Sequence, residues 1–287
     1  MKKSILCYHI DMQNYSDILN IAEKEISLLK QEMIAGIDVD EKVLEFLNSP
    51  SKHIRPLLSF LYLKALGLDI EDAQIVYQSA IELVHNASLI HDDVIDESDT
   101  RRGKNSLNKD LGNKLAVISG NFLLSKALEK IISINSIELI DLFCRTLKNM
   151  TLGEINQYKL RYEIPDLEDY LKKTEYKTAD LFVLSLKGSL KIAKSEENCD
   201  FAKNFGMAFQ IRDDLINAKT LKTDFDGGIY TAPVIFSGGV EISQNGLEKT
   251  RDLLNNYVEK AEKSIEFLKE SIYKEALLNL VRGLQNE

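Results

Sequence analysis

The chain has 287 residues, of which 44% are hydrophobic and 28% are charged, as is usual for a soluble globular protein with a sizeable core. Its formal net charge is −9, whereas a broad nucleic-acid-binding surface would be basic, so we expect no nucleic-acid partner. The 14 Gly and 4 Pro residues are too few for a turn-rich β fold and favour helices.

The cysteines and the apolar runs limit where the chain is expected to act. Cys7, Cys144 and Cys199 are far apart and form no CxxC pair, so neither a disulfide framework nor a zinc ribbon is expected. Three free thiols are typical of the reducing cytoplasm. The apolar stretch near the N-terminus is short and Asp11 interrupts it, so no signal peptide is expected. No run reaches 18 apolar residues, so we expect no stable membrane insertion.

Apolar residues recur at helical spacing along most of the chain, for example over 57–66 and 115–128. Breaks in this pattern are expected at 48–50, 67–69, 102–104, 164–166, 195–200 and 227–228. Roughly ten or more helices fit between these breaks, and no alternating strand pattern of useful length is present. The pattern predicts an all-α bundle that forms a single domain over residues 1–287.

An acidic cluster, His-Asp-Asp-Val-Ile-Asp-Glu at 91–97, follows the apolar helical run 81–90. Asp92 and Asp96 would lie on one helix face, about 6 Å apart along the axis. Such carboxylates repel each other unless a cation binds between them, and oxygen ligands favour Mg²⁺ when phosphates complete its coordination. A solvent-facing acidic helix end is the alternative. Arg101 and Arg102, which follow closely, are strong diphosphate ligands and favour the metal site.

A second acidic cluster, Phe-Gln-Ile-Arg-Asp-Asp-Leu-Ile-Asn at 209–217, also ends an apolar helical segment. Asp213 and Asn217 share a face at four-residue spacing. If the two helices faced each other across a bundle core, their carboxylates could hold several magnesium ions.

The two clusters, the first followed by Arg-Arg-Gly, resemble those of the trans-isoprenyl diphosphate synthases. The resemblance extends over about 51–233 and includes His85, which lies seven residues before Asp92. Its other motifs occur in the family's order: Ser-Lys-His-Ile-Arg-Pro at 51–56, Gly153-Glu154 with Gln157, Lys177-Thr178-Ala179, Phe209-Gln210 and Thr231-Ala232-Pro233.

The resemblance implies a helical bundle around a central cavity and a magnesium-dependent prenyltransferase that acts as a homodimer. Its substrates would be an allylic diphosphate and isopentenyl diphosphate. The implied metal ligands are Asp92, Asp96 and Asp213. The implied ligands of the allylic diphosphate are Arg101, Lys177, Thr178 and Gln210. Those of isopentenyl diphosphate are Lys52, Arg55, His85 and Arg102. Catalysis would depend on Asp92, Asp96, Asp213, Lys177 and Arg101.

Small residues before the first cluster indicate a long product. Ala87 and Ser88 lie about one helical turn before Asp92, where short-chain members of the family typically carry an aromatic plug. The resemblance therefore implies a long-chain enzyme similar to octaprenyl diphosphate synthases. Its primer would be farnesyl or geranylgeranyl diphosphate, and its product would become a quinone side chain.

The sequence also departs from the family pattern. Asn217 stands where the family has Asp, and Ile229 stands where it usually has Lys. Lys219 and Lys222 are both candidates to replace the usual diphosphate-binding lysine, and the sequence does not choose between them. These departures motivate one alternative, a non-catalytic regulatory subunit of a heteromeric synthase. A class I terpene cyclase is a second alternative, although no Ser/Thr and Glu pattern follows Asp213.

Overall fold

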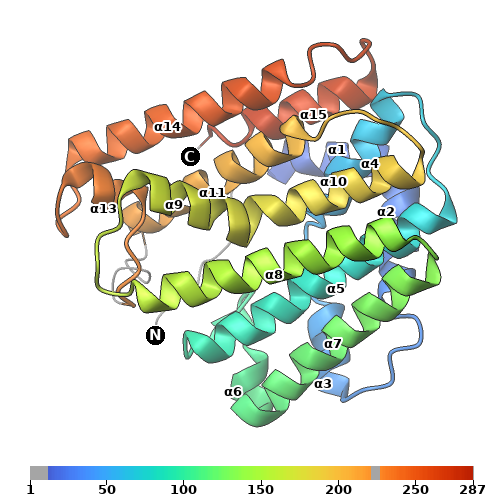
Figure 1. Ribbon diagram of the computed structural model, residues 1–287, viewed down its shortest axis with the longest axis horizontal. Coiled ribbons are helices and arrows are strands. Elements are labelled where there is room, and N and C mark those ends of the chain that lie inside the picture. The colour runs from blue at the N-terminus through green and yellow to red at the C-terminus, as the bar shows by residue number, and fades with distance from the viewer. Residues whose placement is uncertain (1–11, 221–226, 287) are drawn as a thin grey trace.

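The computed structural model describes residues 12–220 and 227–286, and these are almost entirely helical (Figure 1). The helices are α1 (Met12–Ile21), α2 (Glu23–Ile34), α3 (Glu41–Leu47), α4 (Ile54–Ala65), α5 (Asp72–Ile95), α6 (Leu107–Leu111), α7 (Asn113–Ser133), α8 (Ile137–Lys159), α9 (Leu167–Thr174), the π-helix η1 (Glu175–Ala179), α10 (Asp180–Ile192), α11 (Asp200–Thr220), α13 (Ala232–Ser237), α14 (Gln244–Lys263) and α15 (Ile272–Arg282). The predicted all-α fold and the expected abundance of helices are therefore confirmed.

The predicted breaks fall between helices, and the one at 102–104 is a small hairpin. Strands β1 (Thr100–Arg101) and β2 (Lys104–Asn105) pair antiparallel. Arg102 and Gly103 between them have φ values of 52° and 77°, as a two-residue type I′ turn requires. Strands of two residues are too short to produce an alternating pattern, which explains why the sequence did not reveal them.

Several helix starts are encoded by capping side chains. Asp166, at the break that contains Pro165, accepts a hydrogen bond from the backbone N–H of Asp169 at 2.8 Å and begins α9. Ser243 and Ser271 cap α14 and α15 in the same way. These caps begin helices at the positions where the apolar periodicity resumes.

The central helices are buried on more than one side, as the sequence predicted. Eleven of the twelve residues of α4 are buried, and α5 buries Ile81, Leu83, Ala87 and Ile90 along most of its length. Helices α5, α7 and α8 run side by side, while α10 and α11 lie between this group and α14 and α15 (Figure 1). The C-terminal parts of α5 and α11 carry the acidic clusters, in which Asp93 and Asp214 are buried whereas Ile95 and Asp96 at the end of α5 are exposed.

Within the described residues, no helix combines the length and the apolar character needed to cross a membrane. Cys144 is exposed and Cys199 half-buried, and both are free thiols. Cys7 lies outside the described residues.

Candidate active site

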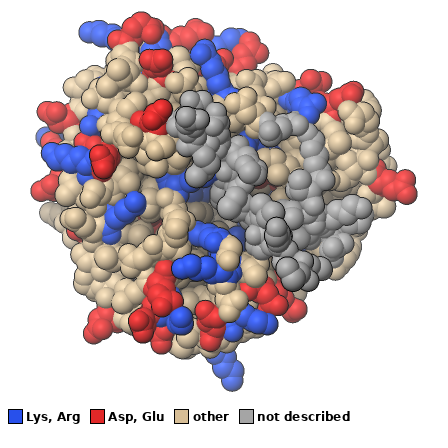
Figure 2. All heavy atoms as spheres, turned by 180° about the vertical axis from the view of Figure 1, so that it is seen from behind, with Lys and Arg blue, Asp and Glu red and all other residues tan. Residues whose placement is uncertain are grey.

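Residues from both acidic clusters line one cavity of about 300 Å³, and Asp96 is not among them. Its polar lining consists of Arg55, His85, Ser88, His91, Asp92, Thr151, Glu154, Lys177, Thr178, Gln210 and Asp213. Its apolar lining consists of Val84, Leu89, Ile95, Leu124, Leu147, Met150 and Phe209. Although the chain is acidic overall, Lys and Arg side chains gather near the middle of the face shown in Figure 2. A cavity with both linings can hold a molecule that has an anionic head and an apolar tail.

Asp92 faces the cavity near the end of α5 and lies opposite Lys177. Lys177 Nζ is 3.9 Å from Asp92 Oδ2 and 2.6 Å from Glu154 Oε2. Burial raises the pKa of Asp92 to about 6; Lys177 opposes this shift, and Glu154 and Asp96 add to it. Burial lowers the pKa of Lys177, but the carboxylates of Asp92 and Glu154 outweigh this effect and the net shift is upward. Lys177 is therefore charged, and Asp92 would gain from a further cation.

Asp93 and Arg101 form a separate pair outside the cavity. The fully buried Asp93 carboxylate accepts a hydrogen bond from Arg101 Nε at 3.0 Å, and Asp93 also accepts through its backbone from Ser98. Arg101 is absent from the residues that line the cavity. In this structure its guanidinium therefore fixes the hairpin after α5, and the predicted contact with the allylic diphosphate stays a prediction.

The two aspartates of the second cluster point in different directions. Asp213 lines the cavity, whereas Asp214 is 2% exposed. Asp214 accepts hydrogen bonds from Tyr170 Oη at 2.6 Å and from Gln210 Nε2 at 2.8 Å. Successive helical residues diverge by about 100°, so only Asp213 can serve as a cavity ligand while Asp214 anchors α11 to α9.

Lys177 and Thr178 are presented by the π-helix η1. Thr178 Oγ1 donates to Gln210 Oε1 at 2.7 Å, which links η1 to α11. The two elements approach closely because Gly206 of α11 has no side chain: a Cβ there would lie 2.7 Å from Ala179 Cα. Single π-turns within helices are frequent at functional sites, and here the widened turn brings the Lys177 and Thr178 side chains to the cavity.

The residues expected to bind isopentenyl diphosphate divide into two pairs. Arg55 and His85 line the cavity, whereas Lys52 and Arg102 do not. The Arg55 guanidinium stacks over the Phe182 ring at 4.7 Å. Arg102 donates to Ser49 Oγ at 2.8 Å and to Asn86 Oδ1 at 3.3 Å.

A buried hydrogen-bonded pair lies beside these cations. His53 Nδ1 is 2.6 Å from Glu82 Oε2, and both side chains are almost completely buried. Burial lowers the pKa of His85 well below its usual range, and Arg55 and Arg102 lower it further. The structure therefore presents His85 as a neutral hydrogen-bonding group, and Arg55 is the cation on this side of the cavity.

The sequence did not predict a functional role for Glu154 or for Arg161. Glu154 pairs with Lys177 at 2.6 Å, and Arg161 Nη2 pairs with Asp96 Oδ1 at 2.7 Å. The Gly-Glu-x-x-Gln spacing was the signal for Glu154, whereas no motif contains Arg161. Asn217 is half-buried in α11; the side chain of Lys219 and all of Lys222 lie outside the described residues, so the choice between them is untested.

The acidic side chains fit magnesium that is shared with a phosphate ligand. Within the described residues, no three Asp, Glu, His or Cys side chains converge closely enough to bind an ion by themselves. Mg²⁺ is usually bound by one or two carboxylates, with substrate phosphates and water completing its shell. Asp92 of α5 and Asp213 of α11 offer hard oxygen donors to the same cavity, which suits an ion bound together with a diphosphate.

Comparison with known proteins identifies similar chains. The family model described as Polyprenyl synthetase matches residues 39–275. Solanesyl diphosphate synthase 2, chloroplastic, of Arabidopsis thaliana is 28% identical over 92% of this chain and 75% of its own length. Decaprenyl-diphosphate synthase of Dictyostelium discoideum is 31% identical over 80% of this chain and 58% of its own length.

A solved structure extends the similarity to the fold. A polyprenyl synthase from Caulobacter crescentus CB15, complexed with calcium and isoprenyl diphosphate, superposes with a TM-score of 0.84. It is 25% identical, and the match covers 95% of this chain and 98% of that one. The bundle expected from the sequence resemblance is therefore the bundle observed.

Proposed function

Because the chain belongs to the polyprenyl synthetase family, we propose that it lengthens an allylic diphosphate by successive condensations with isopentenyl diphosphate. One observation carries this proposal: Asp92 and Asp213, from two helices far apart in sequence, line a single cavity together with Lys177. The proposed catalytic domain spans residues 1–287. The cavity's polar part would hold the diphosphate, and its apolar part would hold the hydrocarbon chain.

The proposed metal ligands are Asp92, Asp96 and Asp213. Bound Mg²⁺ would supply Lewis-acid stabilisation of the departing diphosphate. Lys177 donates to the same diphosphate from η1, and its charge is maintained by Asp92 and Glu154. Arg101, as the family resemblance implies, would reach the allylic diphosphate only after loosening its contact with Asp93.

Thr178 and Gln210 would face the allylic carbon after the carbon–oxygen bond breaks. Their mutual hydrogen bond fixes the Gln210 carbonyl dipole in the cavity that Lys177 also lines, where it can stabilise positive charge. The double bond of isopentenyl diphosphate then attacks the cation, and the released diphosphate takes the proton lost from the product. No protein nucleophile is needed. Lys52, Arg55, His85 and Arg102 would hold the second diphosphate.

We propose a long-chain product, made from a farnesyl or geranylgeranyl primer and used as a quinone side chain. The relatives named solanesyl and decaprenyl diphosphate synthase support the chain-length class. The cavity adds that Ser88 lines its wall, whereas Ala87 is fully buried in the core. The small side chain that leaves room for the product is therefore that of Ser88.

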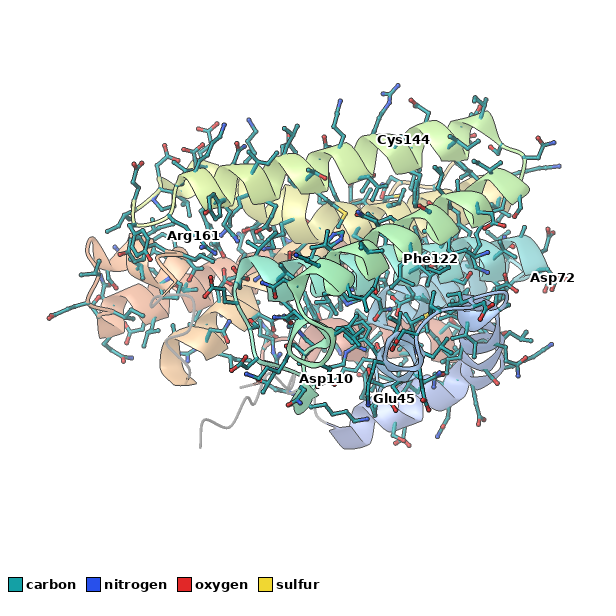
Figure 3. All side chains as sticks on the ribbon, turned by 90° about the horizontal axis from the view of Figure 1, so that it is seen from below. Glu45, Asp72, Asp110, Phe122, Cys144 and Arg161 are labelled. Carbon is teal, nitrogen blue, oxygen red and sulfur yellow. The ribbon has the colours of Figure 1, made fainter. Side chains whose placement is uncertain are left out.

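We also propose a homodimer that forms through α7. This helix exposes Leu115, Ile118 and Ile132, with exposed fractions of 40%, 61% and 52%. Phe122, labelled in Figure 3, lies one turn from Ile118 on the same face. Exposed apolar clusters of this kind mark association surfaces. Sedimentation analysis of the wild-type chain and of Ile118→Glu tests this proposal, and a monomeric wild type would refute it. A cytoplasmic location, suggested by the scattered cysteines, stays a prediction.

The deciding experiment is product analysis with purified protein, farnesyl diphosphate, labelled isopentenyl diphosphate and Mg²⁺. We expect long polyprenyl diphosphates that require both substrates and disappear in Asp213→Asn. Hydrocarbon released from farnesyl diphosphate alone would instead identify a cyclase. If the folded chain forms no product until a second subunit is added, the regulatory-subunit alternative is correct and the proposal is wrong.

A further inference from the structure

Arg161 contacts an acidic-cluster carboxylate although it belongs to none of the motifs. Its Nη2 lies 2.7 Å from Asp96 Oδ1, across 65 positions of sequence. The two side chains are 23% and 33% exposed. Solvent reaches both partners, which limits what the pair contributes to stability, and its place at the end of the first acidic cluster points to a role in the site.

The connection between α8 and α9 holds Arg161 in place (Figure 3). The Arg161 guanidinium lies over the Tyr158 ring at 4.9 Å. The next residue, Tyr162, has φ 68° and donates its backbone N–H to Gly228 O at 2.8 Å. A Cβ on Gly228 would lie 2.6 Å from the Tyr162 ring, so this contact requires glycine. Arg161 is therefore anchored on one side to α8 and on the other to the segment that follows the second acidic cluster.

Asp96 needs such a restraint more than Asp92 does. Asp92 lies within α5 and is surrounded by Lys177 and Glu154. Asp96 is the C-cap of α5, and Glu97 after it has φ 50°, so the helix ends at this point. A terminal side chain is less constrained by its own helix, and a bond to an anchored guanidinium limits the orientations it can adopt.

We propose that Arg161 is a positioning residue for Asp96, which holds the carboxylate ready to bind Mg²⁺ together with a diphosphate. This inference rests on the proposed function. An ionised carboxylate has about four acceptor positions, so a guanidinium bond and a metal bond can share it. Hydrogen-bond partners of metal ligands commonly contribute about 10–100-fold to metal affinity. If Arg161 competed with the metal instead, its removal would tighten Mg²⁺ binding, which is the opposite sign.

The test measures Mg²⁺ binding without turnover, by calorimetry in the presence of inorganic pyrophosphate. We expect Arg161→Gln to raise the Mg²⁺ concentration at half-saturation about tenfold or more, and Arg161→Lys to recover part of the loss. Arg145→Gln is the matched control, because Arg145 pairs with Asp141 at 2.9 Å on an exposed face of α8. The control should leave Mg²⁺ binding unchanged. Without Mg²⁺, both glutamine variants should unfold at similar temperatures.

The Asp96→Asn variant distinguishes a wrong metal-site assignment from a wrong positioning role for Arg161. If Asp96→Asn leaves Mg²⁺ binding unchanged, the metal-site assignment itself is wrong. If Asp96→Asn weakens binding while Arg161→Gln leaves it unchanged or tightens it, the positioning role of Arg161 is wrong and the metal site stands. If both variants weaken binding and Arg161→Gln adds little in the Asp96→Asn background, the two residues act as one unit and the inference holds.

Discussion

Replacing Gly206 with Ala should displace the π-helix that carries Lys177 and Thr178. The new Cβ would lie 2.7 Å from Ala179 Cα and 3.0 Å from Phe182 Cδ2. Carbon atoms in contact prefer about 3.5–4.0 Å, so η1 must move by about 1 Å relative to α11. The nearest atom belongs to the backbone, and no side-chain rotation can relieve the contact.

The two consequences of this change differ in size. Overpacking a core costs about 1–3 kcal/mol, but Ala is favoured over Gly within a helix by about 1 kcal/mol. The net loss of stability should therefore be about 0–2 kcal/mol, or a few degrees in the unfolding midpoint. A misplacement of about 1 Å in an active site can cost about 10²-fold in rate, so activity should respond more strongly than stability.

The assay pairs condensation kinetics with thermal unfolding. We expect Gly206→Ala to lower kcat for the condensation by about 10²-fold while the protein stays folded. Gly239→Ala is the control, because a Cβ there meets nothing within 4 Å. A Gly206→Ala variant with wild-type kcat and an unchanged unfolding midpoint would show that the α11–η1 approach does not set the site geometry.

Three further predictions concern single side chains. Ser88→Phe should shorten the longest product seen by chromatography because Ser88 lines the cavity. Ala87→Phe should mainly lower the unfolding midpoint because Ala87 is fully buried. An unchanged product from Ser88→Phe would contradict the assignment of Ser88 to the cavity wall. Burial raises the pKa of Asp92 from 3.8 to about 6, so the folded state binds this proton more tightly than the unfolded state, and metal-free stability should fall as pH rises through that window. Asp92→Asn should remove this slope and stabilise the metal-free protein above about pH 6 in urea unfolding; a slope that persists would show that another group is responsible. Asp213→Asn should weaken Mg²⁺ binding and leave the free energy of unfolding nearly unchanged. Asp214→Asn should lower the free energy of unfolding by about 1–3 kcal/mol because a buried acceptor of two hydrogen bonds is altered. Equal effects of the two changes on stability would contradict the different orientations of the two side chains.

The sequence predicted the parts of the site that depend on local spacing. Asp92 and Asp96 lie at the end of a long apolar helix, as their four-residue spacing indicated. Lys177 and Thr178 reach the same cavity as Asp213, in agreement with the motif order. The helix positions were predictable because helical periodicity and capping are encoded within a few residues of each other, whereas the roles of these residues stay predictions.

Other features depend on residues that are distant in sequence. Nothing local distinguishes Asp93 from Asp92, yet one is held by Arg101 and the other faces the cavity. Ala87 and Ser88 are likewise adjacent and small, but only Ser88 lines the wall. Which face of a helix is covered depends on the helices packed against it, and the local sequence pattern does not determine how those helices are arranged.

By itself, the sequence determined that this chain forms helices, that two of them end in carboxylates, and that cationic residues accompany both clusters, because local periodicity and composition encode these properties. Only the tertiary structure decided that Asp92 and Asp213 share one cavity, that Asp214 is an anchor, and that Arg161 reaches Asp96. The physical reason is that such pairings depend on how distant helices pack, which no short stretch of sequence specifies.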